Sequence, residues 1–177
     1  MDTLSSQPGI SEENTGNPIG LESETASAVA TDLRRHQASL SVLFHQYQKH
    51  HWMVEGHVFR DLHHFFEEQY TAVLKALDAV AERVTMLGGM PASSPAALLE
   101  FSYLDHEPEQ NYPLRAMLVH DLRAEQRMAM MLRQSIRATN ELGDFGSETL
   151  LRGVLMGCED RAHHLDHYLA DSNFGHG

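Results

Sequence analysis

The sequence predicts an all-α protein, a four-helix bundle with a short extra helix in the connection between the second and third long helices. Three observations carry this prediction. Apolar residues recur at three- and four-residue steps through four long segments, the periodicity of helices that bury one face. Glycine and proline interrupt the chain between those segments. One segment, from about Val58 to Leu87, runs for about 30 residues, which is long for a small domain and typical of a bundle.

The first two long helices are expected over residues 28–56 and 58–87. The apolar stripe of the first comprises Leu33, Leu40, Leu43, Phe44, Tyr47, His51 and Val54. The stripe of the second comprises Leu62, Phe65, Phe66, Val73, Leu77, Val80, Val84 and Leu87. Two glycines and a proline at 88–91 form a strong stop, because glycine suits the left-handed cap of a helix.

The second half of the chain predicts the remaining elements. Residues 90–111 form a long connection, and an apolar run at 97–101 within it predicts the short helix. The third long helix is expected from about residue 111, with Pro113 in its first turn, where proline is tolerated. A turn containing two glycines follows, and the fourth helix is expected over residues 147–170.

Composition separates one folded domain from two tails. Residues 1–25 are rich in small and polar residues and predict a flexible, acidic N-terminal tail without Lys or Arg. Residues 26–172 are expected to form the bundle, which suits a chain of 177 residues, and residues 173–177 a C-terminal tail.

Charge and cysteine content narrow the class of protein. The net charge is −12 and only two lysines occur, so the sequence offers no obvious basic cluster for DNA. We therefore expect DNA binding to be weak or absent. The single cysteine, Cys158, excludes an internal disulfide and suits a reducing compartment. No apolar run reaches membrane-spanning length and no signal-peptide pattern opens the chain, so we expect a cytoplasmic protein.

Two pairs of metal-ligand residues lie at helical i,i+4 spacing in the second predicted helix. One pair is His63 and Glu67, and the other is Asp78 and Glu82. Residues four apart share one helix face, so either pair could bind one metal ion. His51, twelve residues before His63, could supply another imidazole.

The distance between the pairs limits how they can act. Glu67 and Asp78 are eleven residues apart, roughly 16 Å along a straight helix. The two pairs therefore cannot bind the same ion within one chain. They predict either two weak two-ligand sites or two shared sites, in which His63 and Glu67 of one chain face Asp78 and Glu82 of a second copy across a two-fold axis.

A site inside the bundle is the alternative. Such di-iron sites use Glu on two helices and Glu-x-x-His on the other two. Asp61-x-x-His64 and Asp160-x-x-His163 imitate the second element with shorter acids, but the first helix offers acids only near its ends. We therefore favour the site between subunits.

The segments HWMVEG, FRDLHHFFEE, DAVAER and LGG resemble the Dps family, the mini-ferritins that protect DNA in starved cells. The resemblance spans residues 28–171. It implies a ferritin-like fold and a hollow shell of twelve subunits built from two-fold dimers. It also implies a ferroxidase that oxidises Fe(II), preferably with hydrogen peroxide, stores the ferric mineral inside and so protects DNA from oxidative damage.

The same resemblance assigns residues to roles. The matching ligand positions are His51, His63, Glu67, Asp78 and Glu82. The position of Glu67 more often holds Asp in the family. Trp52 could donate an electron, shield the site or only pack. Asp144 and Glu148 are weak candidates for an iron-entry pore, and His64 and Glu68 for mineral nucleation.

The histidines near the C-terminus depart from many members of the family. The position of His163 often holds Trp, and the run with His164 and His167 is closer to the histidine-rich form of cyanobacterial and halophile members. His164 is our choice for an extra imidazole that completes the iron site or relays iron toward it. Surface histidines without a metal role are the equal alternative.

Two other functions stay open. One is a non-enzymatic nucleoid protein that coats DNA. The other is a zinc or mixed-metal buffer, because zinc also accepts His and carboxylate ligands and could substitute for iron. The sequence contains no glycine-rich phosphate loop, no zinc spacing of paired cysteines and no nucleophile elbow.

Overall fold

The computed structural model describes residues 17–170, and most of the predicted N-terminal tail and all of the predicted C-terminal tail lie outside that part. The element order is α1 (Ser23–Met53), α2 (Phe59–Met86), α3 (Pro95–Phe101), α4 (Leu114–Glu141) and α5 (Phe145–Ala170). Four of these helices are long and one is short, and no strand occurs within the described residues. The predicted fold class is confirmed.

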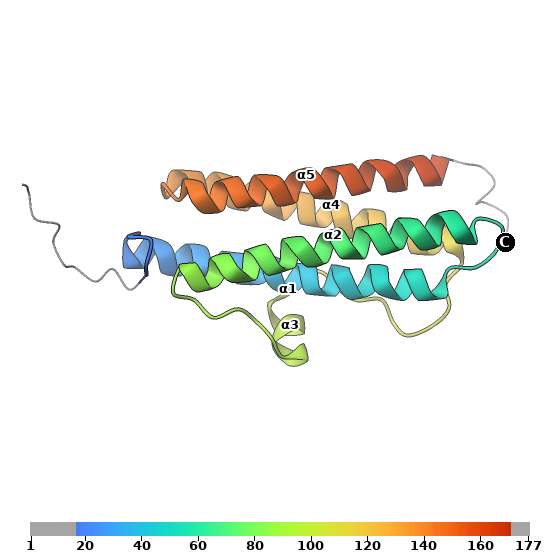
Figure 1. Cartoon of the computed structure of the whole chain (residues 1–177), viewed down its shortest axis with the longest axis horizontal. Helices are drawn as coiled ribbons and strands as arrows, with labels where there is room; N and C mark the ends of the chain where they lie inside the picture. Colours follow the sequence, from blue (N-terminus) through green and yellow to red (C-terminus); the bar gives the residue numbers. More distant parts are fainter. Residues whose placement is uncertain (1–16, 171–177) are drawn as a thin grey trace, which may run out of the picture.

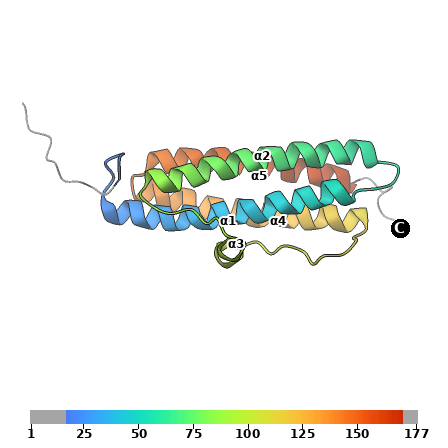
Figure 2. The ribbon, with the colours of Figure 1, turned by 60° about the horizontal axis from the view of Figure 1, so that its bottom comes forward.

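The long helices form two antiparallel hairpins that pack side by side (Figure 1). Short connections join α1 to α2 and α4 to α5, whereas the segment between α2 and α4 returns along the length of the bundle. The short helix α3 lies in this return segment, outside the bundle and against α1 (Figure 2). Because α4 is antiparallel to α5 and α1 to α2, the end of α1, the start of α2 and the end of α5 meet at one end of the bundle.

The core is built from the apolar stripes of the four long helices. Its largest fully buried apolar side chains are Tyr47, Phe66, Leu33, Leu40, Leu43, Leu62, Leu118, Met128, Leu132, Leu151 and Leu165. Burying each such side chain contributes about 1.5–3 kcal/mol, so the packing of the four stripes, rather than helix propensity, holds these helices in place.

Two predicted helix starts were late. The first helix begins at Ser23, inside the segment that we expected to be tail, after a turn in which the Asn17 amide donates to the carbonyl of Leu21 (2.8 Å). Helix α5 begins at Phe145, because Asp144 caps it and accepts the backbone N–H of Ser147 (2.9 Å). The start of α1 depends on a turn held by the Asn17 side chain, and that of α5 on the Asp144 cap. The apolar periodicity registers neither contact.

The return segment is fastened to the bundle by buried polar contacts. His36 on α1 bonds the Tyr103 hydroxyl through Nδ1 (2.7 Å) and the Ser135 hydroxyl of α4 through Nε2 (2.8 Å). Further along, Lys49 donates to the carboxylate of Glu107 (2.9 Å). These contacts hold residues 102–113 against α1 and α4. Within residues 17–170, no helix is long and apolar enough to cross a membrane.

Candidate metal centre

His51 and His63 lie against each other where α1 ends and α2 begins. Gly56, with φ +94°, turns the chain between them, a conformation that favours glycine. His51 Nδ1 lies 2.8 Å from the backbone carbonyl oxygen of His63, and His63 Nδ1 lies 2.9 Å from the carbonyl oxygen of His51. The two rings stack with their centroids 3.7 Å apart. The hairpin thus pairs the two imidazoles reciprocally.

This pairing fixes the tautomer of both rings. A carbonyl oxygen only accepts hydrogen bonds, so both Nδ1 atoms must carry the proton and donate it. In the neutral ring the lone pair then sits on Nε2, the nitrogen that a metal ion binds. A backbone carbonyl that holds the far nitrogen of a metal-binding histidine is the usual support for such a ligand. The hairpin therefore holds both imidazoles in the same tautomer, with the proton on Nδ1 and Nε2 free to bind a metal ion.

Aromatic rings border the pair. Phe59 stacks on His63 with centroids 4.8 Å apart, and Tyr70 meets His51 edge-on at 5.4 Å. Both imidazoles remain partly exposed, so the rings restrict their motion without closing off the surface.

The three candidate carboxylates lie at two places relative to the imidazole pair. Glu67 is exposed one turn after His63, and its carboxylate Oε2 lies 3.8 Å from Nδ1 of His64. Asp78 and Glu82 are exposed further along α2, and their carboxylates contact no partner within residues 17–170. Because α2 is one continuous helix, Asp78 lies roughly 22 Å from His63 along the axis.

The ligands of one chain therefore fall into two groups. Among the described residues, no cluster of three or more His, Cys, Asp or Glu side chains could hold a metal ion. The imidazole group lies near one end of α2 and the carboxylate pair toward the other, as the sequence spacing predicted.

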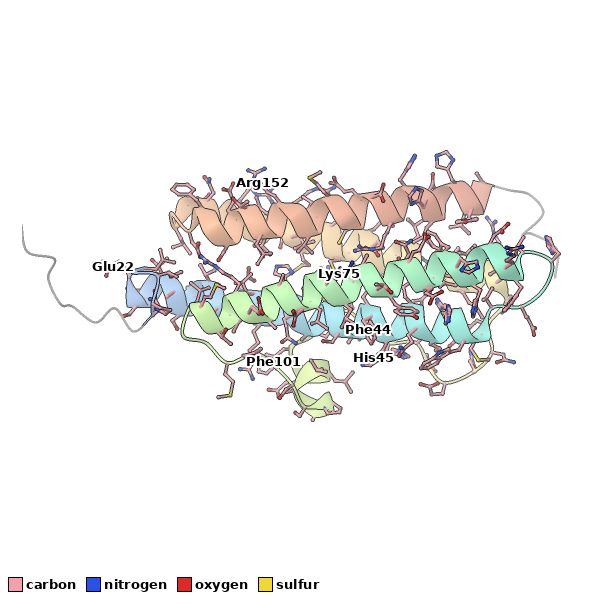
Figure 3. The ribbon with its side chains drawn as sticks, in the orientation of Figure 1. Glu22, Phe44, His45, Lys75, Phe101 and Arg152 are labelled. Carbon is pink, nitrogen blue, oxygen red and sulfur yellow. The ribbon has the colours of Figure 1, made fainter. Side chains whose placement is uncertain are left out.

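Trp52 lies away from the imidazole pair. It is 66% exposed and lines a hollow of about 680 Å³ between α1 and α3, together with Leu98 and Leu99. Figure 3 shows His45, which also borders this hollow, on the side of α1 where α3 packs. No contact within residues 17–170 assigns Trp52 a role, so electron donation, shielding and packing all stay predictions.

The predicted accessory and nucleation residues are on the surface. His163 and His167 meet edge-on with centroids 4.4 Å apart, and His164 lies 3.8 Å from Asp160. His164 also packs edge-on against Phe65 of α2 at 6.3 Å, but it makes no contact with the His51–His63 pair among the described residues. His64 and Glu68 are exposed on α2, and no contact assigns them a role.

The two predicted pore residues are buried and paired within the chain. Asp144 accepts from Arg83 (2.7 Å) in addition to capping α5. Glu148 accepts from Arg152 (2.7 Å), whose side chain Figure 3 shows on the face of α5 that points away from α2. The structure therefore gives Asp144 a structural role at the start of α5, and the pore role stays a prediction.

The interior of the bundle holds an ion pair that the sequence analysis missed. Arg161 donates through Nε to Oε1 of Glu125 (2.5 Å) and through Nη2 to Oε2 (3.1 Å), and the Tyr47 hydroxyl donates to Oε1 (2.7 Å). Burial, followed by the charge of Glu125, raises the pKa of Tyr47 well above its usual range. The only sequence signal for this ion pair was the occurrence of Glu125 and Arg161 among the apolar positions of their helices. The two Asp-x-x-His pairs that imitate an internal di-iron site are exposed at the surface instead.

A second buried cluster lies next to the imidazole pair. His50 Nδ1 lies 2.7 Å from Asp121, and His50 Nε2 lies 2.8 Å from Glu107. Burial alone lowers the pKa of His50, but the carboxylates of Asp121 and Glu107 outweigh it, so the pKa is raised. Burial raises the pKa of Asp121 to about 6. This cluster joins α1, α4 and the return segment, and its His50 directly precedes His51 in the chain.

Helix α4 carries a row of exposed arginines that the sequence analysis did not identify. All five arginines of α4 are exposed: Arg115, Arg123, Arg127, Arg133 and Arg137. They fall within an arc of about 120° around the helix. The acids Asp121 and Glu125 are buried on the opposite face, which leaves Glu141 in the last turn as the one exposed acid of α4. We call this set of five side chains the arginine stripe.

Comparison with known proteins gives a consistent family. The ferritin-like domain family matches residues 30–173. The chain is 40% identical to a nutrient stress-induced DNA-binding protein of Synechococcus, over 87% of this chain and 88% of the relative. It is 37% identical to a DNA protection during starvation protein of Halobacterium salinarum, over 86% of this chain and 84% of the relative.

Solved structures agree with these relatives. An archaeal Dps homologue from Halobacterium salinarum superposes with a TM-score of 0.86 at 34% identity, covering 96% of this chain and 95% of the other. Dps from Thermosynechococcus elongatus superposes with a TM-score of 0.80 at 30% identity, covering 84% of this chain and 94% of the other. The chain is therefore a member of the Dps family of ferritin-like proteins.

Proposed function

We propose that this protein is a ferroxidase that oxidises and stores iron at sites shared between two subunits. The reciprocal pairing of His51 and His63 is the observation that carries the proposal, because it presents two Nε2 lone pairs side by side at the protein surface. Membership of the Dps family supports the same function.

The donor set suits iron. Two neutral imidazoles and the carboxylates of Glu67, Asp78 and Glu82 give a mixed nitrogen and oxygen environment that Fe(II) accepts and that offsets the charge of Fe(III). Zinc accepts the same donors, so occupancy by zinc would block oxidation rather than support it.

The shared arrangement follows from the length of α2. His63 and Asp78 are separated by roughly 22 Å, so one ion cannot bind both within a chain. A second copy packed antiparallel across a two-fold axis would bring its Asp78 and Glu82 to His63 and Glu67, and the same contact would complete a second site. Six such dimers would form the dodecameric shell, in the cytoplasm.

The reaction balances with peroxide as oxidant. Two Fe(II) ions each lose one electron, hydrogen peroxide accepts both electrons and two protons, and two molecules of water form. The imidazoles and carboxylates of the site would hold the ions together, so that both electrons pass to one peroxide and no hydroxyl radical is released. The ferric product would then move into the shell and mineralise.

An iron-loading assay tests the proposal. Fe(II) is added anaerobically to the metal-free protein, then half an equivalent of peroxide, and ferric absorbance and iron retained on gel filtration are measured. We expect fast oxidation with retained iron in the wild type and loss of both in Asp78→Ala. Glu141→Ala removes an exposed carboxylate elsewhere and serves as the control. Oxidation at the protein-free rate, or an unaffected Asp78→Ala variant, would refute the ferroxidase proposal.

DNA binding is a second candidate function, and the arginine stripe favours it. The stripe runs from Arg115 to Arg137, roughly 33 Å along α4, and three of its members have no partner within residues 17–170: Arg123, Arg127 and Arg137. Arginines that track a duplex backbone neutralise phosphates independently of sequence. A relative is named for DNA binding as well.

Fluorescence anisotropy with duplex DNA at several salt concentrations tests this second candidate. We expect the double variant Arg123→Gln/Arg127→Gln to bind more weakly and to reduce the salt slope by about one unit per arginine. Arg60→Gln, an exposed arginine on α2, is the control. Equal effects of the stripe and control variants, or no binding at low salt, would contradict a DNA-binding role for the stripe.

A further inference from the structure

His163 and His167 form a pair that the iron site leaves unused. They lie one turn apart near the end of α5, both are exposed, and their ring centroids are 4.4 Å apart at 79°. Neither ring makes a hydrogen bond within residues 17–170, so both nitrogens of each ring are available. His164, between them in sequence, is placed differently, because it packs toward α2 against Phe65.

The pair has the geometry of a helical chelate. Side chains at i and i+4 are about 5–6 Å apart at Cβ, so two imidazoles there can bind one ion after small rotations about their side-chain bonds. The rings are free to make those rotations because they are exposed and bound to no fixed acceptor. By contrast, the His51 and His63 rings are locked by the backbone.

The donor atoms select the metal. Imidazole nitrogens suit borderline divalent ions, and the affinity of such sites is greatest for Cu(II). We propose that His163 and His167 chelate one Cu(II) per chain, at a site separate from the His51–His63 pair.

Neighbouring charge favours a cation at this place. Asp160, three residues before His163, is largely exposed, and its Oδ2 lies 3.8 Å from Nδ1 of His164. Glu159 already pairs with Arg133 of α4 (2.6 Å), so the arginine charge near the pair is balanced. Asp160 is thus the carboxylate that could add an oxygen ligand, with water completing the coordination. The site would hold copper on α5 while the imidazole pair of α1 and α2 stays open for iron.

Titration of the metal-free, full-length protein with Cu(II) tests the proposal. Calorimetry measures the affinity, and electron paramagnetic resonance identifies the ligand atoms. All variants carry His63→Gln, so that the α1–α2 pair does not compete for copper. We expect one tight Cu(II) site per chain with two-nitrogen coupling in the spectrum. Either His163→Gln or His167→Gln should weaken it by roughly a hundredfold, since loss of one ring abolishes the chelate.

The matched control is His164→Gln, which removes a neighbouring exposed histidine from the same turn and should leave the copper affinity within about twofold. Circular dichroism confirms that each variant is folded. The proposal is overturned if His164→Gln weakens copper binding as much as His163→Gln, if the double variant His163→Gln/His167→Gln keeps the wild-type affinity, or if Zn(II) binds at least as tightly as Cu(II).

Discussion

Arg161 donates two hydrogen bonds, of 2.5 and 3.1 Å, to the carboxylate of Glu125 in the interior of the four-helix bundle. Arg161 is 5% exposed and Glu125 is fully buried. The guanidinium of Arg161 thus neutralises the carboxylate of Glu125, so this buried carboxylate is not left free to bind a metal ion inside the bundle.

Removing the cation should destabilise the bundle strongly. Arg161→Gln leaves the carboxylate of Glu125 buried without its charge partner, which costs about 3–5 kcal/mol. Chemical denaturation followed by circular dichroism measures this cost. The double variant Arg161→Gln/Glu125→Gln should recover part of it, because no buried charge remains.

The control is an exposed pair between the same two helices. Arg133→Gln breaks the contact with Glu159, both partners being about half exposed, and should cost less than about 1 kcal/mol. A similar cost for Arg161→Gln and Arg133→Gln would contradict a structural role for the buried pair.

Shared iron sites can be tested by mixing subunits. His63→Ala and Asp78→Ala should each abolish rapid iron oxidation alone. When the two variants are unfolded, mixed in equal amounts and refolded together, half of the dimers are mixed, and each mixed dimer contains one intact site. About a quarter of the wild-type activity should therefore return. Recovery of no activity, with coassembly verified by mass spectrometry, would show that the ligands do not combine between chains.

Acid should weaken the fold through His36. Burial lowers the pKa of His36 to about 4, against 6.5 for an exposed histidine. The folded protein holds this ring neutral, so the unfolded chain binds more protons and stability falls as pH drops below 6.5 toward 4. Between pH 7.5 and pH 5 the contribution amounts to roughly 2 kcal/mol of unfolding free energy.

Comparing pH profiles isolates this histidine from the other titrating groups. His36→Gln should lose less stability than the wild type over the same interval, although it starts lower at pH 7.5 because contacts with Tyr103 and Ser135 change. His57→Gln, at an exposed position, should follow the wild-type profile. Parallel profiles for all three proteins would remove His36 as the source of the acid sensitivity.

Replacing either of two glycines with alanine should change the stability of the protein in opposite directions. A Cβ at Gly89 would lie 2.9 Å from the Cβ of Ala30 and 3.1 Å from the backbone oxygen of Val84, so Gly89→Ala should cost about 1–3 kcal/mol. Gly153 lies within α5 with open space around it, so Gly153→Ala should stabilise by about 0.5–1 kcal/mol. Thermal unfolding measures both, and a stabilised Gly89→Ala variant would contradict the close packing of α1 against the end of α2.

The apolar stripes were sufficient to predict the bundle, because buried positions recur at helical spacing along each long segment. Leu33 and Leu62 are fully buried as expected. The starts of α1 and α5 were misplaced, since each depends on polar contacts rather than on periodicity. Ser23 follows a turn held by Asn17, and Asp144 caps α5.

The sequence predicted the types and spacing of the candidate ligands, but it did not predict the hydrogen bonds that hold them in place. The i,i+4 pairs of α2 could be read directly, whereas the hydrogen bonds from His51 and His63 to each other's backbone depend on how the Gly56 turn closes. The arginine stripe was missed because its members are spread over residues 115–137 and form one surface only when the segment is helical.

The reciprocal pairing of His51 and His63 also makes the two ligands mutually dependent. Each ring is oriented by the other residue's main chain, so a distortion at the end of α1 reaches the start of α2 without passing through the core. A chain whose hairpin is opened loses both imidazoles in one event. Metal binding and closure of this hairpin should therefore be thermodynamically linked: an ion that binds both rings tightens the junction, and a loosened junction releases the ion.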